Sequence, residues 1–491
     1  MKKIMLFLLF PFIMYGQTQI GQDIDGEAAA DNMGNEVSLS SDGSVLAVGA
    51  IRNAGNGTNS GHVRVFENVG GTWTQIGQDI DGEAPSNLSG RGLSLSSDGS
   101  IVAIGANLND GNNGDDNSAG HVRVFENEGG TWTQIGQDID GENEGDFSGT
   151  NISLSSDGTI IAISSRNVDA NGNNAGVVRI FEIVGDTWTQ IGENIDGEGE
   201  DDGSGAGLSL SSDGSIVAIG APRNDLGGLS NTGHVRVYEN QGGTWTQIGQ
   251  DVDGFSGNGR LGTSVSLSSD GTIFAAGAPR VLSETGIVGV YRNQGGTWIQ
   301  IGDNIVGEAT DDRSGGSVSL SSDGTIVAIG SQNNDGNGQN SGHVRIYKNV
   351  SNVWTQIGTD INGEDTFQHF EGMGLSLSSD SSTVAIGYSR NNGVNGEDSG
   401  SARVFDLSAI LSTNEFDISQ FQLYPNPASD HITINLENGS TLEKTTIYNS
   451  LGQIVKTSIE TTISTIDLSK GMYIVEVLTT QGKASKKLII E

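Results

Sequence analysis

The stretch LSLSSDGSIVAIGA, residues 93–106, decides the fold, because close copies of it recur six more times before about residue 406. With the aspartate of each SSD triplet as a marker, the copies lie at Asp42, Asp98, Asp157, Asp213, Asp270, Asp323 and Asp380. The intervals between them are 56, 59, 56, 57, 53 and 57 residues. A nearly fixed period of this length is typical of stacked supersecondary units, none of which can bury its apolar face alone.

Each repeat unit predicts four strands. Apolar residues alternate on both sides of Asp98-Gly99, a dipeptide suited to the tight turn of a hairpin. Residues 120–127, GHVRVFEN, predict a third strand, and residues 131–142, TWTQIGQDIDGE, predict a fourth. Seven four-stranded units predict an all-β chain built around a seven-bladed β-propeller.

A linear solenoid is the competing arrangement, and the phase of the repeat favours a closed ring. The chain enters at residues 17–23, QTQIGQD, part way into the TWTQIGQDIDGE element. It leaves the repeats at residues 401–405, in the element equivalent to GHVRVF. The N-terminal segment could therefore complete the seventh unit, whereas a linear array would need distinct capping repeats.

Composition restricts the classes of function. The chain has 491 residues, 75 glycines and no cysteine, so disulfides and thiol chemistry are excluded, and any metal site would use oxygen or histidine ligands. The net charge is −37, and residues 17–406 carry 52 acidic against 16 basic residues. Such an acidic body argues against binding nucleic acid or an anionic membrane, and it suits divalent cations or neutral glycans.

The first sixteen residues predict a secretory signal peptide. Lys2-Lys3 precede an apolar run over residues 4–15, which is shorter than a membrane span needs, and cleavage is expected near Gly16. We therefore expect residues 1–16 to be removed on export and the propeller to occupy residues 17–406.

Two loops in each unit vary in length and are rich in Asn, Asp and Gly, so ligand binding is expected there. No cofactor is certain from the sequence, but oxygen-rich loops that turn at glycine can wrap a calcium ion. The first calcium candidates are Asp110, Asp115, Asp116 and Asp169.

Two other recurring groups are expected to be structural. The histidines of GHVRV are replaced by Val177, Ile287 and Ser401 in other units, which indicates a position that tolerates apolar side chains. The DIDGE carboxylates recur in nearly every unit, as turn residues do, whereas a catalytic pair needs one asymmetric pocket.

The unit resembles the FG-GAP repeat, the blade of integrin-α-type propellers. Residues 261–265, LGTSV, stand where that family has FG-x-S-V, and Gly220-Ala221-Pro222 matches its GAP element, as do residues 277–279. The resemblance spans all seven units and implies the propeller fold. The calcium loop of the family has several carboxylates, whereas SSDGS supplies one, so those calcium ligands are not expected here.

The composition changes after a predicted linker, residues 407–420. Short alternating strand patterns in residues 421–491 predict a small Ig-like β-sandwich. This segment closely resembles the C-terminal sorting domain of the type IX secretion system of Bacteroidota. The motif residues are Tyr424, Pro425, Asn426, Pro427, Gly452, Gly471 and Tyr473. The resemblance implies the type IX machinery as a partner and passage across the outer membrane, followed by surface attachment or release.

No G-x-S-x-G, H-E-x-x-H or P-loop motif and no Cys/His pair occurs, so the sequence predicts a protein that is not an enzyme. The leading hypothesis is a monomeric, secreted or cell-surface propeller that binds or adheres to a glycan or a surface protein through its loops. One alternative is a secreted polysaccharide-acting enzyme with its site in the propeller channel. Another is a purely structural surface protein.

Overall fold

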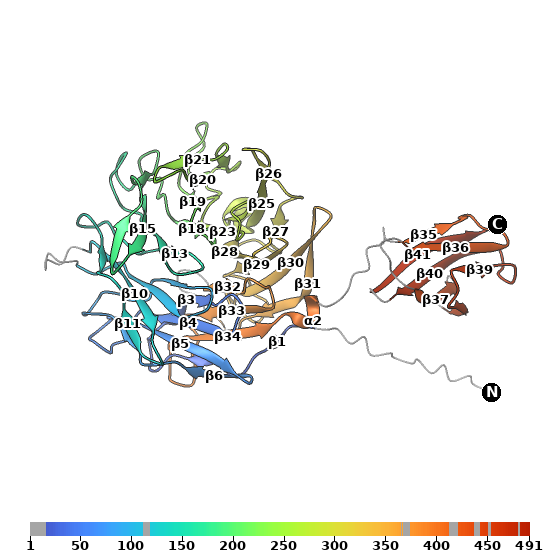
Figure 1. The fold of residues 1–491 in the computed structure, drawn as a ribbon, viewed down its shortest axis with the longest axis horizontal. Coiled ribbons are helices and arrows are strands. Elements are labelled where there is room, and N and C mark those ends of the chain that lie inside the picture. The colour runs from blue at the N-terminus through green and yellow to red at the C-terminus, as the bar shows by residue number, and fades with distance from the viewer. Residues whose placement is uncertain are drawn as a thin grey trace. The chain divides into compact units, whose positions relative to one another are not determined.

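The computed structural model describes residues 16–110, 118–364, 366, 374–411, 421–436, 442–449, 453–479 and 482–491. The predicted signal peptide, apart from Gly16, lies outside the described residues. The chain divides into two compact units, Met1–Ile410 and Leu411–Glu491 (Figure 1). Among the helices of the described residues, none has the length and apolarity that crossing a membrane would need.

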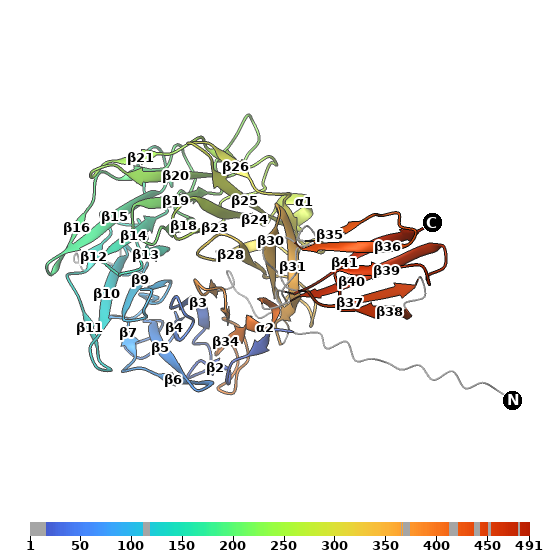
Figure 2. The same cartoon turned by 45° about the vertical axis from the view of Figure 1, so that its right-hand side comes forward.

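The first unit is the predicted seven-bladed β-propeller (Figure 2). The innermost strands are β3 (Met33–Leu39), β8 (Gly92–Leu95), β13 (Ile152–Leu154), β18 (Gly207–Leu210), β23 (Ser264–Leu267), β28 (Ser314–Leu320) and β32 (Leu375–Leu377). The second strands are β4 (Val45–Ala50), β9 (Ile101–Ala106), β14 (Ile160–Ser165), β19 (Ile216–Ala221), β24 (Ile273–Ala278), β29 (Ile326–Ser331) and β33 (Thr383–Tyr388). The third strands are β5 (His62–Val69), β10 (His121–Asn127), β15 (Val177–Val184), β20 (His234–Asn240), β25 (Ile287–Asn293), β30 (His343–Val350) and β34 (Ser401–Asp406).

The outer edge of most blades is a pair of short strands. These are β6 (Thr72–Gln75) and β7 (Ile80–Asp81), β11 (Trp132–Gln134) and β12 (Ile139–Asp140), β16 (Thr187–Gln190) and β17 (Ile195–Asp196), β21 (Trp245–Gln247) and β22 (Val252–Asp253), and β26 (Trp298–Gln300) and β27 (Ile305–Val306). The sixth blade has one long strand instead, β31 (Val353–Asn362).

The ring closes in the seventh blade, as the phase of the repeat predicts. There β1 (Thr18–Gln19) and β2 (Ile24–Asp25) pair with β34 from the end of the propeller, Thr18 opposite Asp406 and Asp25 opposite Ser401. The solenoid alternative is therefore wrong. Gln17 stands where the other units have tryptophan, and Ile410 of α2 (Ser408–Leu411) lies beside Gly358 in the place that an indole ring takes in the other blades.

The repeated LSLSSDG stretch explains the closure, because its polar groups bond from blade to blade. The serine before the last leucine of each inner strand accepts a hydrogen bond from a leucine N–H of the next blade. These pairs, from donor to acceptor, are Leu95 to Ser38, Leu154 to Ser94, Leu210 to Ser153, Leu267 to Ser209, Leu320 to Ser266, Leu377 to Ser319 and Leu39 to Ser376. The last pair joins the seventh blade to the first. The serine ladder thus forms a complete ring, which a sequence without this polar position could not make.

Tryptophans pack the outer parts of neighbouring blades together. Trp132 is 4% exposed, and its Nε1 donates to the Ile76 carbonyl of the preceding blade at 2.8 Å. The indole ring lies against Gly77, whose φ of +72° is a conformation in which a side chain would be strained and would also meet the ring. The same tryptophan-to-carbonyl bond recurs in the other tryptophan-bearing blades at 2.8–3.1 Å.

The second unit is the predicted small β-sandwich. One sheet contains β35 (Phe421–Tyr424), β36 (His431–Leu436) and β39 (Thr462–Ser464). The other has the order β38-β37-β40-β41 and contains β37 (Leu442–Asn449), β38 (Ile454–Ser458), β40 (Gly471–Thr479) and β41 (Gly482–Ile490). Phe421, Ile432, Ile447 and Leu488 are buried between the two sheets.

Candidate functional site

Both variable loops of every blade open at the same end of the ring, because neighbouring strands of a blade are antiparallel. The connection from the second to the third strand and the connection to the next blade meet there, and we call this end the loop face. The SSDG hairpin turns lie at the opposite end of the channel.

The arginines divide between the blades and the loop face. All fifteen arginines of the chain lie in described parts of the propeller, and seven of them are on third strands. The other eight lie in loop-face connections: Arg52, Arg91, Arg166, Arg223, Arg260, Arg280, Arg313 and Arg390. Eight of the fifteen arginines therefore lie at the loop face, among the acidic residues of the same connections.

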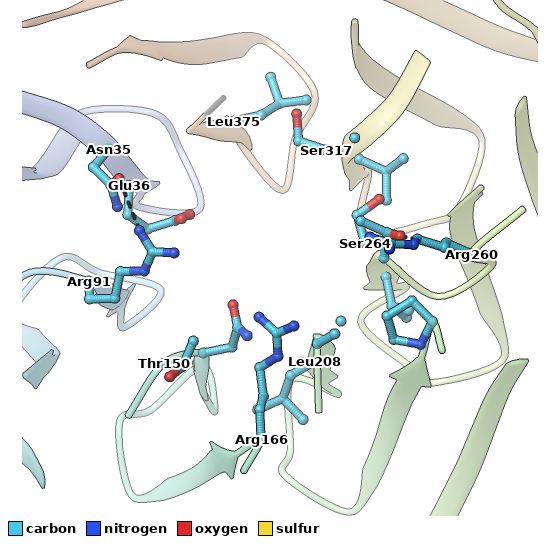
Figure 3. A pocket seen from close by; sticks show the side chains of 18 of the residues that line it. Asn35, Glu36, Arg91, Thr150, Arg166, Leu208, Arg260, Ser264, Ser317 and Leu375 are labelled. Atoms are coloured by element: carbon cyan, nitrogen blue, oxygen red, sulfur yellow. Dashed lines mark hydrogen bonds between the residues drawn. The ribbon is translucent and has the colours of Figure 1, made fainter. Parts of the chain in front are cut away.

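A cavity of about 320 Å³ occupies the loop-face end of the channel and is lined by residues of all seven blades. Four arginines line it, Arg91, Arg166, Arg223 and Arg260, whereas Glu36 is the only acidic residue among its described lining. Figure 3 shows Arg91 and Arg166 reaching into the same space, with Glu36 beside Arg91. The whole chain has 61 acidic and 24 basic residues, so this arginine-lined cavity inverts the charge balance of its surroundings.

One repeated position, at the start of the inner strands, supplies part of the cavity wall in five blades, through Glu36, Asn151, Gly207, Ser264 and Ser317. Glu36 occupies this position in the first blade, where other blades have glycine, serine or asparagine. Asn151 donates from Nδ2 to the Gly205 carbonyl at 3.1 Å, and Ser264 Oγ donates to the Gly315 carbonyl at 2.9 Å. These bonds fix the polar wall, and Glu36 makes the cavity asymmetric.

The arginines of the cavity act on one another. Burial lowers the pKa of Arg260, and the positive charges of Arg280, Arg223 and Arg313 lower it further, while Glu284 opposes them. The Nε of Arg260 is also buried without a hydrogen-bond partner. An anion in the cavity would reduce this repulsion and offer acceptors to the guanidinium groups.

Glu36 has a pKa well above that of an ordinary glutamate. Desolvation by burial raises its pKa to about 7, against the opposing effects of Arg91 and of the hydrogen bond from the Val37 N–H. A carboxyl group with this pKa can donate or accept a proton near neutral pH.

The two described calcium candidates, Asp110 and Asp169, are not among the residues that line the cavity. Asp110 Oδ1 accepts a hydrogen bond from the Ser118 N–H at 3.3 Å, and Asp169 Oδ1 accepts one from the Asn174 N–H at 2.9 Å. Each carboxylate thus bonds within the loop of its own blade. Asp115 and Asp116 lie outside the described residues, and calcium binding by these loops stays a prediction.

Four repeated groups of Glu, His and Asp come close enough to hold a metal: Glu27, His62 and Asp79; Glu83, His121 and Asp138; Glu198, His234 and Asp251; and Glu308, His343 and Asp360. In each group, an arginine two residues after the histidine contacts the glutamate, as Arg123 contacts Glu83 with 3.6 Å between Nη1 and Oε1. Arg123 also donates from Nη2 to the Asp81 carbonyl of the preceding blade at 2.7 Å. The guanidinium group takes the place of a cation between the blades.

The recurring histidines are held neutral in these groups. Burial, followed by the positive charge of Arg123, lowers the pKa of His121 to about 4, although Asp138 opposes the shift. The cluster lies at the contact between blades, and the structural role expected for these histidines from the sequence stays a prediction.

The motif residues of the second unit are part of its framework. Asn426 donates from Nδ2 to the Lys487 carbonyl at 2.7 Å and accepts from the Ile489 N–H at 3.0 Å, which ties the Tyr424, Pro425 and Pro427 segment to β41. Gly471 begins β40, and the buried Tyr473 donates its hydroxyl to the Ser469 carbonyl at 2.8 Å. Gly452 lies outside the described residues, and a direct role of these residues in sorting stays a prediction.

The arginine-lined cavity was not predicted from the sequence, although the repeat units place arginines at recurring positions. Arg52, Arg223, Arg280 and Arg390 recur at one position, two residues beyond the second strand of a blade, and Arg260 and Arg313 share another. Alignment of the seven units by position would have shown that both positions belong to the loop face.

Comparison with known proteins identifies the second unit. Residues 422–491 match the family model of the secretion system C-terminal sorting domain. The type IX sorting domain expected from the sequence is thus confirmed, and the protein is secreted or located at the cell surface. No curated protein matches the sequence of this chain.

Solved structures share the propeller fold at low identity. A structure described as a 6-phosphogluconolactonase from Bacteroides uniformis is 14% identical, with 67% of this chain and 86% of that chain covered and a TM-score of 0.45. The periplasmic gluconolactonase of Pseudomonas aeruginosa is 17% identical, with 67% and 85% covered and a TM-score of 0.45. The resemblance of the repeat units to the FG-GAP family stays a prediction.

The prediction that the chain is not an enzyme is corrected by this finding, because both neighbours are named after enzymes. It rested on the absence of short catalytic motifs. A site at the centre of a propeller takes single residues from blades that are more than fifty residues apart, so it leaves no local motif. The likeness to these structures is one of fold and assigns no activity to this chain.

Proposed function

We propose that this exported propeller binds an anionic ligand in the arginine-lined cavity, with an acidic glycan as the ligand class. The observation that carries the proposal is the presence of four arginines and one carboxyl group in a cavity of a chain whose net charge is −37. Guanidinium groups pair with carboxylate or sulfate oxygens through two parallel hydrogen bonds. A cavity of about 320 Å³ is within the range of small-ligand sites and could take the end of a chain.

Arginines on the third strands have a structural role, because they join neighbouring blades. Arg179 donates from Nη2 to the Asp140 carbonyl of the preceding blade at 2.7 Å and lies 5.3 Å over the ring of Phe181. Arg260 instead has a pKa lowered first by burial and then by the positive charges of Arg280, Arg223 and Arg313. A cluster of like charges weakens the fold unless a ligand uses it, which supports a binding role.

Binding can be tested by titration calorimetry with an oligogalacturonate, using the corresponding neutral oligogalactan as the control sugar. We expect saturable binding of the acidic sugar alone, with affinity that falls as salt screens the charges. The triple variant Arg91→Gln, Arg166→Gln and Arg223→Gln should lose at least about tenfold in affinity.

The control for charge compares each single variant of the three, Arg91→Gln, Arg166→Gln or Arg223→Gln, with Arg292→Gln, which removes one positive charge from an exposed position on β25. Arg292→Gln should bind as the wild type does. Equal losses in the single variants and in this control would mean that net charge and not the cavity decides binding. An absence of saturable binding to any acidic sugar would favour the purely structural alternative.

A second candidate function is catalysis on the same ligand, because Glu36 lines the cavity beside Arg91 and its pKa is raised to about 7. Glu36 could then act as a general acid or base in hydrolysis. Glu36→Gln should abolish turnover of an acidic polysaccharide while binding persists. Failure of the wild type to cleave any such polymer that it binds would remove this candidate.

A further inference from the structure

A second cavity adjoins the arginine-lined cavity on the loop face, and residues of the second, third and fourth blades line it. Its volume is about 190 Å³. It shares part of its wall with the arginine-lined cavity, namely Arg91, Thr150, Arg166 and Arg223. The rest of its described lining is uncharged and consists of Asn107, Phe147, Asn167 and Gly203. We call this space the side cavity. Because three arginines line both spaces, a ligand held in the first can continue into the second.

Gly203 leaves room for the side cavity. It belongs to a position that recurs in the connections between blades, where the backbone N–H bonds to a loop carbonyl of the preceding blade. The other described members of this position have φ between +52° and +60° and all carry side chains: Asn32, Leu88, Phe147, Arg260 and Arg313. Gly203 has φ of +62°, and a Cβ added there would meet no described atom within 4 Å. The fourth blade therefore keeps open a space that a side chain could fill.

Asn107 presents an unused acceptor to the side cavity. Its Nδ2 donates to Thr150 Oγ1 at 3.4 Å, whereas its buried Oδ1 accepts no hydrogen bond from the described residues. A buried acceptor without a donor costs free energy, and a carboxylate has no proton with which to satisfy it. A hydroxyl group can donate to it. The side cavity therefore suits a ligand that carries hydroxyl groups as well as negative charge.

The positive charge around the two cavities exceeds what one carboxylate can use. Four arginines line them, and Glu36 is the only acidic residue of their described linings. One carboxylate pairs with one guanidinium group through two parallel hydrogen bonds. Four arginines around two adjoining spaces therefore suit a ligand with more than one carboxylate.

Two aspartates that precede lining residues of the side cavity in the chain do not neutralise these arginines from within it. Asp146 and Asp202 are each 4% exposed, and neither belongs to the described lining of either cavity. Asp146 Oδ2 accepts from the Asn143 N–H at 2.8 Å, and Asp202 Oδ2 accepts from the Gly199 N–H at 2.9 Å. Both carboxylates thus hold the turn of their own connection.

We propose that the two cavities hold two consecutive units of an acidic glycan, one unit in each. The inference rests on the proposed function, because it extends the same ligand, and it adds a preference for oligomers over monosaccharides. The shared arginines pair with the carboxylates of both units. Asn107 accepts a hydroxyl group of the second unit, and Phe147 gives its ring an apolar wall.

Titration calorimetry of the mature chain with three sugars tests the preference. The sugars are galacturonate, digalacturonate and a disaccharide in which galactose replaces one galacturonate. We expect digalacturonate to bind at least about tenfold more tightly than either of the others. Equal affinities for galacturonate and digalacturonate would overturn the inference. Equal affinities for the two disaccharides would overturn the assignment of a carboxylate to the second unit.

The variant Gly203→Leu fills the side cavity with the residue that the second blade has at this position, Leu88 at φ of +53°. Gly203 is not part of the lining of the arginine-lined cavity. The variant should therefore bind galacturonate as the wild type does and lose the gain for digalacturonate. The matched control is Gly70→Leu on the outer hairpin of the first blade, where φ is +61° and an added Cβ also meets no described atom within 4 Å. This control should keep both affinities.

Asn107→Ala is a second, independent change, because Asn107 also lines only the side cavity of the two. It should weaken the binding of digalacturonate and leave that of galacturonate unchanged. A Gly203→Leu variant that keeps the full preference for digalacturonate would overturn the second unit's site while the first site stands. An absence of saturable binding by galacturonate and digalacturonate alike would overturn the proposed function and this inference with it.

Discussion

Replacement of His121 by valine should remove part of the acid sensitivity of the propeller. Valine and isoleucine occupy the equivalent position in two other blades, at Val177 and Ile287, so the fold accepts the change. His121 is 1% exposed and faces Asp138, Glu83 and Arg123 between the blades. Because its pKa is lowered to about 4, the histidine stays neutral in the folded protein while the unfolded chain takes up a proton below about pH 6.5.

The direction of the effect follows from this difference in pKa. The stability contributed by neutral His121 is fully present above about pH 6.5 and is lost as the pH falls from there toward the folded pKa. At pH 5 the unfolded state gains about 2 kcal/mol from protonation of one such histidine, whereas at pH 7 the gain is only about 0.2 kcal/mol. His62 and His234 have pKa values lowered to about 4 as well, so the wild type should lose stability at several blades together.

The assay is urea unfolding followed by tryptophan fluorescence at pH 7 and pH 5. Between the two pH values, the free energy of unfolding of the wild type should fall by about 2 kcal/mol more than that of His121→Val. The other groups that titrate in this range are present in both proteins, so their contribution cancels in the comparison. His431→Gln is the matched control, since His431 is half exposed in the second unit. Equal losses in wild type and His121→Val would refute the reasoning, because His121 would then be protonated in the folded state and paired with its carboxylates.

Three further predictions address the ring and its turns. Ser153→Ala leaves the buried Leu210 N–H without its acceptor at 3.0 Å, so the free energy of unfolding should fall by about 1–3 kcal/mol in urea titrations. Asp98→Ala removes an Oδ1 that accepts three hydrogen bonds at 2.7–2.9 Å, so the free energy of unfolding should fall by about 1–2 kcal/mol at pH 7. Because the pKa of Asp98 is lowered in the folded protein, the difference in stability between wild type and variant should shrink as the pH falls below about 4. Deletion of residues 17–25 removes β1 and β2 and leaves β34 as an open edge, so the melting temperature should fall and light scattering should show association. An unchanged melting temperature for any of the three would contradict the assigned contact.

The fold could be predicted because several separate features of the repeat indicate the same arrangement of strands. The Asp98-Gly99 turn, the alternating strands and the phase of the ends each indicate the same closed ring, and the structure has them all. The serine ladder was not foreseen, although its residues were in the defining stretch. A serine in an alternating strand looks like an ordinary solvent-facing residue until the neighbouring blade is in place.

The candidate site was predicted less well, for a physical reason. The sequence gives only the net charge of the chain, which is −37, and this net charge favoured cations or neutral sugars as the expected ligands. The structure separates the charges in space and places Arg91, Arg166, Arg223 and Arg260 around one cavity. Which residues meet at the mouth of a channel depends on which loops share an end of the ring, and periodicity alone does not give that.

The most direct test of the central claim is a crystal structure of the mature propeller with an acidic oligosaccharide. We expect the sugar in the cavity at the loop-face end of the channel, with its carboxylates on Arg91, Arg166 and Arg223 and its ring close to Glu36. An acidic sugar bound elsewhere on the ring, with this cavity unchanged, would contradict the account.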